Sequence, residues 1–323
     1  MPSGNDVFWG GQEAAKYLLN GTNIYNATYY VYNNPVWAGV PFKVYTYLPG
    51  TTIFEALFYS IFADIRYAIM FADTGIAILL YLIIRKKNED YGRAAMSFYL
   101  LAMALTFVAP SRVFDTRISD GLTDPIWCVM LLSAIYLSMK NQKLAAAIFV
   151  GYALATKQFA ILFFIPIAIL WLKKDVNFKR DYRSIVISVG VATAIILPFF
   201  LWSPSNFVNG TMTSLPSQGI AISLGQPQWN MSIPAQMTFF GINIGVRITH
   251  IIQIAVIGGL LVALRNKITN IFSATLVFVV IYTIFLSFNN FTQYFYWLSI
   301  IPYILIAFSH SFTDYVKKDD NHS

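Results

Sequence analysis

The charged residues of this chain that could do chemistry gather near the outer ends of its apolar segments. They are Asp6, Glu13, Arg66, Asp115, Arg117, Asp120, Asp124 and Lys157. The apolar segments themselves are largely clean of charge, whereas a channel or transporter is expected to place polar groups near the middle of the bilayer. Chemistry confined to one membrane boundary suits an amphipathic substrate, with its tail in lipid and its head group among the loops.

Lys157 is the sharpest single candidate. It lies between two short apolar segments, 144–156 and 158–172, and the loops at their far ends are basic. The two segments are therefore expected to form a hairpin whose tip reaches the outer face. A lysine at that tip can bind a lipid phosphate as a compact cation. Snorkelling of the side chain to the interface explains the same position equally well.

Three more charged candidates lie in predicted external loops. Asp6 precedes a stretch rich in aromatic residues and glycine and is, by position alone, a possible helix N-cap. Arg117 and Asp120 occupy the second external loop, where they could assist a phosphate or an acceptor. The alternative for these two is a local surface ion pair worth at most about 1 kcal/mol.

Aromatic and amide side chains supply the remaining candidates for substrate binding. Tyr47 lies in a turn before residue 50, and Gln293 and Tyr294 open the last apolar segment. An aromatic belt at the membrane interface explains the tyrosines equally well. The single cysteine excludes a disulfide framework and a cysteine-based metal site, and the three histidines are too scattered to suggest a histidine-ligated metal.

The composition indicates that membrane helices must position these residues. Of the 323 residues, 57% are hydrophobic and only 11% are charged, whereas a soluble domain carries about 25% charged residues. A soluble fold and a disordered chain are thereby excluded. The net charge of +7 is interpreted as loop charge that sets membrane orientation rather than as a nucleic-acid surface.

Nine apolar segments are predicted to be helical and to form an all-α, polytopic transmembrane bundle. They cover residues 67–84, 94–110, 126–139, 144–156, 158–172, 184–202, 248–264, 268–286 and 294–312. If residues 1–46 are external, alternate crossings place 15 of the 22 lysines and arginines on the cytoplasmic side, as the positive-inside rule requires. The chain is then one membrane domain, with residues 1–46 as the first external loop, 67–312 as the bundle and 313–323 as a cytoplasmic tail.

Residues 51–65 differ from the nine segments. Their apolar side chains follow helical spacing on one stripe, from Phe54 to Ile65, and Glu55 and Asp64 fall off that stripe. This pattern predicts an amphipathic helix that lies at the outer interface rather than a span.

The order of these motifs along the chain resembles the GT-C superfamily of integral-membrane glycosyltransferases. The motifs are an acidic residue near the start, the stretch from Ala15 to Tyr25, an aromatic turn that ends at Pro49, an interfacial helix, an arginine that opens the next span, the Lys157 hairpin and an aromatic start to the last span. The likeness extends over most of the chain. It is greatest to the polyprenol-phosphate-mannose-dependent mannosyltransferases and more distant to the catalytic subunit of the first GPI mannosyltransferase.

The resemblance implies transfer of a hexose, mannose in those relatives, from a polyprenyl or dolichyl phosphate to an acceptor hydroxyl on the non-cytoplasmic face, with inversion. Asp6 matches the family's catalytic acid and is expected to be the base. Lys157, with Arg117, is expected to hold the donor phosphate, and Tyr47, Asp120, Gln293 and Tyr294 are candidate substrate contacts. The partners are the lipid-linked sugar, membrane lipids and a glycan, lipid or protein acceptor. No cofactor is expected, and a divalent metal is not favoured because the first loop has no D-x-D motif.

Two alternatives stay open. A lipid or solute transporter or flippase would show paired charges at mid-depth or a repeated, broken-helix half, and neither is visible in the sequence. Family members usually carry a transmembrane helix before the first-loop acid, and this chain starts five residues before Asp6. That difference predicts an N-terminal truncation, and it also leaves a non-catalytic membrane subunit as an interpretation.

Overall fold

The computed structural model describes residues 6–30, 41–42, 44–108, 122–173, 178–213, 232–239, 246–289 and 294–309. Nearly all of this is helical. The elements are α1 (Asp6–Leu19), β1 (Tyr29–Tyr30), β2 (Pro41–Phe42), α2 (Pro49–Phe62), α3 (Arg66–Ile84), α4 (Glu89–Val108), α5 (Asp124–Met139), α6 (Lys143–Thr156), η1 (Gln158–Ala160), α7 (Ile161–Lys173), α8 (Phe178–Trp202), α9 (Pro204–Val208), the π-helical η2 (Asn209–Thr213), α11 (Ile233–Phe239), α12 (Val246–Leu264), α13 (Ile271–Phe288) and α14 (Tyr294–Leu298). A last helical stretch covers residues 301–309.

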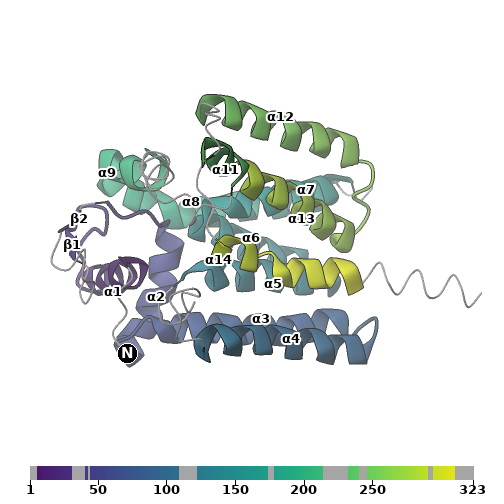
Figure 1. The fold of residues 1–323 in the computed structure, drawn as a ribbon, viewed down its shortest axis with the longest axis horizontal. Coiled ribbons are helices and arrows are strands. Elements are labelled where there is room, and N and C mark those ends of the chain that lie inside the picture. Colours follow the sequence, from purple (N-terminus) through teal and green to yellow (C-terminus); the bar gives the residue numbers. More distant parts are fainter. Residues whose placement is uncertain are drawn as a thin grey trace, which may run out of the picture.

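The long helices lie side by side (Figure 1). Helix α6 packs between α5 and α8, α3 packs on α4 and α5, and α13 packs on α7 and α12. Helices α1, α2 and α9 and the antiparallel pair β1–β2 lie together at the left of this picture, at one end of the long helices. The all-α membrane bundle predicted from the sequence is confirmed, and each of the nine apolar segments corresponds to a helix.

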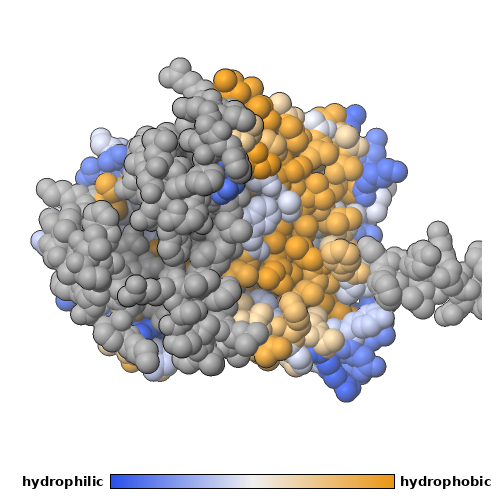
Figure 2. Space-filling model, viewed as in Figure 1, coloured by the Kyte–Doolittle hydropathy of each residue, from blue (hydrophilic) through white to orange (hydrophobic). Residues whose placement is uncertain are grey.

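Within the described parts of the chain, three helical segments are long and apolar enough to cross a membrane by themselves: Arg66–Ile84, Tyr182–Trp202 and Ile271–Phe288. Five more apolar helices among the described residues are shorter, including Asp124–Met139 and Lys143–Thr156. Figure 2 shows a broad hydrophobic band with hydrophilic residues along its right-hand edge in this view. Short helices reach across such a band only as part of a bundle, because a single straight span needs about 20 residues.

The basic clusters of the described residues lie at the end of the bundle where α3, α5, α7 and α12 finish. Arg85 follows α3, Lys140 follows α5 and Arg265 follows α12. The Lys173 ammonium at the end of α7 contacts the Arg265 carbonyl oxygen. The sequence predicted that every second loop between the apolar segments is basic. In the structure, the described basic loops lie together at one end of the bundle.

The predicted interfacial helix is present as α2, and its apolar side faces outward. Leu57, Ile61 and Phe62 are 59%, 67% and 49% exposed, whereas Thr52 and Glu55 are fully buried. A helix at a membrane boundary can direct its apolar stripe into lipid, and its polar stripe then faces the protein. Glu55, which does not belong to the apolar stripe, therefore faces the interior of the protein.

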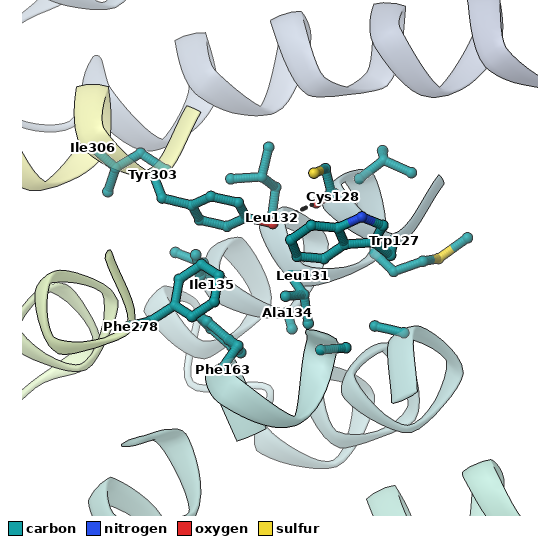
Figure 3. Packing of buried hydrophobic residues seen from close by; sticks show 14 of the residues in the cluster. Trp127, Cys128, Leu131, Leu132, Ala134, Ile135, Phe163, Phe278, Tyr303 and Ile306 are labelled. Carbon is teal, nitrogen blue, oxygen red and sulfur yellow. Dashed lines mark hydrogen bonds between the residues drawn. The ribbon is translucent and has the colours of Figure 1, made fainter. Parts of the chain in front are cut away.

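The hydrophobic core lies between α5, α7, α13 and the last helical stretch (Figure 3). The Trp127 and Tyr303 rings stack with their centroids 6.2 Å apart, and the Tyr303 ring meets the Phe278 ring edge to face at 4.9 Å. The Tyr303 hydroxyl donates to the Cys128 carbonyl oxygen at 3.3 Å. This core fixes the start of α5, which is where the candidate site begins.

Two of the predicted external loops contain helices. Residues 1–46 were expected to form a loop but include the 14-residue helix α1, and residues 203–247 include α9, η2 and α11. Helix α1 packs along α2. The layer at this end of the bundle is therefore built largely from short helices.

Candidate functional site

Lys157 lies at the tip of the hairpin between α6 and α7, as the sequence predicts. Helix α6 ends there because Lys157 adopts an extended backbone (φ −145°, ψ 134°), and η1 then turns the chain into α7. The Lys157 carbonyl oxygen accepts from the Ala160 N–H at 3.1 Å. The lysine therefore projects from a short, hydrogen-bonded turn.

The side chain of Lys157 is buried and ion-paired. Its Nζ lies 3.2 Å from Oδ1 of Asp124, and the two side chains are 9% and 2% exposed. The same Asp124 oxygen accepts from the Trp127 indole N–H at 3.0 Å. Burial by itself lowers the pKa of the Lys157 ammonium, but the Asp124 carboxylate outweighs this effect and holds the pKa above its usual value.

Three aromatic rings surround the ammonium. Nζ of Lys157 lies 5.6 Å from the ring centre of Tyr47, 5.7 Å from that of Phe159 and 5.1 Å from that of Tyr296. Contacts within about 6 Å of a ring centre stabilise a cation. We call Lys157, Asp124, Tyr47, Phe159 and Tyr296 the lysine cage, and it joins residues from four separate parts of the chain.

Helix α2 is fastened to the hairpin at the cage. The Thr51 hydroxyl donates to the Thr156 carbonyl oxygen at 2.9 Å, and the Tyr152 hydroxyl donates to the Gly50 carbonyl oxygen at 3.0 Å. A Cβ on Gly50 would lie 2.6 Å from the Ala155 carbonyl oxygen. Only glycine permits this approach, so the N-terminal end of α2 is locked beside Lys157.

Asp6 begins α1, and its side chain lies outside the described residues. The Phe8 ring lies under the Arg66 guanidinium at 5.0 Å, and Gln12 bonds Ala63 and Ile65, so this end of α1 borders the C-terminal end of α2. Helix α2 has 14 residues, which is about 20 Å of helix. The described contacts therefore bring Lys157 and Tyr47 together and place Asp6 toward the other end of α2.

The other predicted site residues are not located by the structure. Arg117, Asp120 and Gln293 lie outside the described residues. Tyr294 begins α14, and its side chain is likewise outside them. Their roles stay predictions.

Sequence reasoning did not select Asp124, although it was visible at the start of a segment, whereas Tyr296 was expected beside Gln293 and Tyr294 as a residue that could line the donor site. Asp124 was noted only as a boundary charge, and an aspartate before a proline at a helix start is an ordinary cap signal. Its pairing with Lys157 depends on how α5 packs against α6. The signal that could have found it is the need of a buried lysine for a nearby carboxylate.

Glu55 is the second residue that sequence reasoning missed. Both carboxylate oxygens are buried and have no hydrogen-bond partner among the described residues. A Cβ on Gly11 would lie 3.2 and 3.3 Å from these oxygens, so the carboxyl group faces the backbone of α1. Burial raises the pKa of Glu55 from 4.5 to about 8, so the group is mostly protonated at neutral pH.

A carboxyl group lies inside one of the predicted spans. Asp73 of α3 is 5% exposed, and its Oδ1 accepts from the Tyr99 hydroxyl of α4 at 2.6 Å. No group of three or more histidine, cysteine, aspartate or glutamate side chains that could hold a metal occurs within the described parts of the chain. Metal independence is untested and stays a prediction.

The comparisons with known proteins bear on the fold. No protein-family model matches the sequence, and no curated protein sequence matches it significantly. The structure is similar to a crystal structure of ArnT from Cupriavidus metallidurans bound to undecaprenyl phosphate, with a TM-score of 0.52 and 14% sequence identity. The match covers 95% of this chain and 55% of the ArnT chain, so this chain spans about half the length of that protein. The likeness bears on the fold alone: this chain shares the helical membrane fold of that structure, and an all-α membrane fold is what the sequence predicted.

Proposed function

We propose that this chain is a membrane glycosyltransferase that uses a polyprenyl- or dolichyl-phosphate sugar as donor. The sugar is a hexose, and mannose is the choice that the sequence resemblance favours. Transfer goes to an acceptor hydroxyl on the non-cytoplasmic face, with inversion at the anomeric carbon. The observation that carries this proposal is the lysine cage, a buried cation at one end of a bundle whose fold is shared with a protein crystallised with undecaprenyl phosphate.

The lysine cage supports a phosphate-binding role for chemical reasons. An ammonium has three N–H donors, and Asp124 takes one of them, which leaves two for phosphate oxygens. Asp124 keeps the lysine charged and fixes its position. Lys157 is 7% exposed, so donor binding has to displace a ring of the cage, and all three rings are half-buried.

The reaction needs a base and a stabilised leaving group. The acceptor oxygen forms a bond to the anomeric carbon, the bond from that carbon to the phosphate oxygen breaks, and the acceptor proton passes to the base. Negative charge develops on the departing lipid phosphate, where the Lys157 ammonium would stabilise it. The low polarity of the aromatic cage strengthens that interaction.

Asp6 is the proposed base, from its match to the family acid. Because its end of α1 borders the far end of α2, this role requires α1 to move toward the lysine cage when substrate binds. Arg117 is proposed to assist Lys157 at the phosphate, and Asp120, Gln293 and Tyr294 are proposed substrate contacts.

The test uses membranes that contain the full chain and a radiolabelled polyprenyl-phosphate hexose. Label is expected to move to a new product, and Asp6→Asn is expected to abolish the transfer while the protein still inserts. Lys157→Ala is expected to lower the affinity for donor at least tenfold, whereas the exposed Lys16→Ala is its matched control and should bind donor normally. Unchanged donor affinity in Lys157→Ala would refute the phosphate role, and retained turnover in Asp6→Asn would refute the base.

A transporter or flippase is the alternative function, and the buried Asp73 is the observation that favours it. Polar groups inside a span often mark a transport pathway. Label that crosses the bilayer without forming a new bond, and transport that is lost in Asp73→Asn, would support this alternative over the transferase.

A further inference from the structure

A cavity lies at the basic end of the bundle, away from the lysine cage. Its volume is about 380 Å³, and α5, α6, α7 and α13 meet around it together with Lys86, just after α3. This volume falls within the range of about 300–1,000 Å³ that is usual for small-molecule sites. Lys157 and Asp124 are not among the described residues that line it.

The cavity is lined by both cationic and apolar side chains. Lys86 and Lys143 line it, and none of the lining residues that the structure describes is an aspartate or glutamate. Leu170 and Trp171 also line it and are 6% and 3% exposed. A ligand that fits this lining carries an anionic group next to an apolar portion.

Two further polar features belong to residues at the cavity. Ser138 lines the cavity, and its hydroxyl oxygen is buried without a hydrogen-bond partner among the described residues. The 18-residue helix α13 begins at the cavity, where the Asn270 side chain accepts from the Ser273 N–H at 2.8 Å. A helix N-terminus carries a charge of about +0.5, so this end of α13 adds to the attraction of the two lysines for an anion.

Loop charge that orients the protein in the membrane accounts for the lysines by themselves. It does not account for a half-open cavity that both lysines line together with the apolar side chains of Leu170 and Trp171. We propose that this cavity binds the phosphate head group of an anionic glycerophospholipid from the membrane leaflet at the basic end. Basic pockets between membrane helices are known to bind such head groups, and the apolar wall accepts the glycerol and the first part of the acyl chains.

The experiment measures lipid binding to the purified full chain in neutral detergent. Native mass spectrometry with added phosphatidylglycerol or phosphatidylcholine gives the affinity for each lipid. We expect phosphatidylglycerol to bind in preference to phosphatidylcholine. The double variant Lys86→Gln with Lys143→Gln is expected to bind phosphatidylglycerol about 30-fold more weakly, because each lysine near an anionic head group contributes roughly a fivefold gain in affinity.

The matched control is Lys140→Gln with Lys267→Gln, which removes the same charge from the same end of the bundle without touching the cavity. This control is expected to bind phosphatidylglycerol almost as the unaltered chain does. Equal affinity for the two lipids, or equal loss in the two double variants, would overturn the proposal. Complete displacement of the lipid by glycerol 3-phosphate or inorganic phosphate at the same affinity would show a water-soluble ligand and would also overturn it.

Discussion

A lysine can be buried in this protein because a carboxylate is buried with it. Lys157 and Asp124 form an ion pair at 3.2 Å, and the Trp127 indole holds the carboxylate in place. Loss of one partner leaves an uncompensated charge in a nonpolar surrounding, whereas loss of both removes the charge altogether. The pair is therefore expected to behave as one unit when it is altered.

Asp124→Asn is expected to destabilise the folded chain by about 3–5 kcal/mol, because the buried Lys157 ammonium loses its counter-charge. The double variant Asp124→Asn with Lys157→Met should be clearly more stable than the single variant. Thermal unfolding in detergent measures both. Equal stability of the two variants would show that the pair does not act as a unit.

Glu55 makes stability depend on pH in a defined direction. Its pKa is about 8 in the folded chain against 4.5 ordinarily, so the folded chain holds a proton that the unfolded chain has released between these values. The stabilisation is complete below about pH 4.5 and is lost as the pH rises through about 8. The midpoint of thermal unfolding of the unaltered chain is expected to fall across this window.

Glu55→Gln is expected to flatten that dependence, because glutamine does not titrate. Glu89→Gln is the control, since the exposed Glu89 accepts a hydrogen bond from Arg93 in its own helix, and this variant should keep the slope. Thermal unfolding midpoints of both variants, measured at intervals from pH 4.5 to 8.5, show whether Glu55 causes the pH dependence. The same slope in Glu55→Gln would mean that another group causes it.

At the scale of elements, close contact between helices depends on small residues. A Cβ on Gly151 of α6 would lie 2.4 Å from the Ser188 carbonyl oxygen of α8, and the Ser188 hydroxyl donates to the Ala147 carbonyl oxygen at 2.9 Å. Membrane helices associate through such packing and hydrogen bonds because lipid provides no hydrophobic driving force between them. The contact between α6 and α8 matters for the site because α6 carries Lys157 at its end.

Gly151→Ala is expected to push α6 and α8 apart and to destabilise the chain by about 1–3 kcal/mol. Gly190→Ala in α8 is the matched control, because a Cβ there meets nothing within 4 Å. That control should be neutral or stabilising by up to about 1 kcal/mol, since alanine favours a helix over glycine. Thermal unfolding of the two variants measures this difference. Equal stability of Gly151→Ala and Gly190→Ala would contradict the packing argument.

The whole molecule has two chemically different ends. One carries the basic residues that follow α3, α5 and α12, and the other carries the lysine cage beneath α1, α2 and α9. Figure 2 shows the hydrophobic band bordered by hydrophilic residues at the basic end. Which end faces the cytoplasm stays a prediction of the positive-inside rule.

Cysteine labelling in sealed cells tests that orientation. The only natural cysteine, Cys128, is buried and can be replaced by alanine as a background. Ser205→Cys near α9 is expected to react with an impermeant maleimide added outside, and Lys87→Cys after α3 only once the cells are opened. The reverse pattern would invert the proposed topology and place the lysine cage on the cytoplasmic side.

The sequence determined the fold class and the positions of most helices. Apolar runs and their flanking charges are local properties, and the lipid surroundings permit only helices whose backbone groups bond one another. The nine segments, the interfacial helix and the hairpin tip at Lys157 were therefore predictable within a few residues. The helices α1, α9 and α11 were not, because short helices over a membrane surface carry no long apolar run.

The tertiary structure alone decided which side chains surround Lys157 and which way α2 faces. Asp124, Tyr47 and Tyr296 are distant from Lys157 in the sequence and meet it only through helix packing. The sequence shows that Glu55 is not part of the apolar stripe of α2. Only the structure shows that the apolar stripe faces outward, so that Glu55 faces the protein interior. Hydropathy is a property of each segment by itself, whereas burial and pairing arise between segments, and only the packed bundle specifies them.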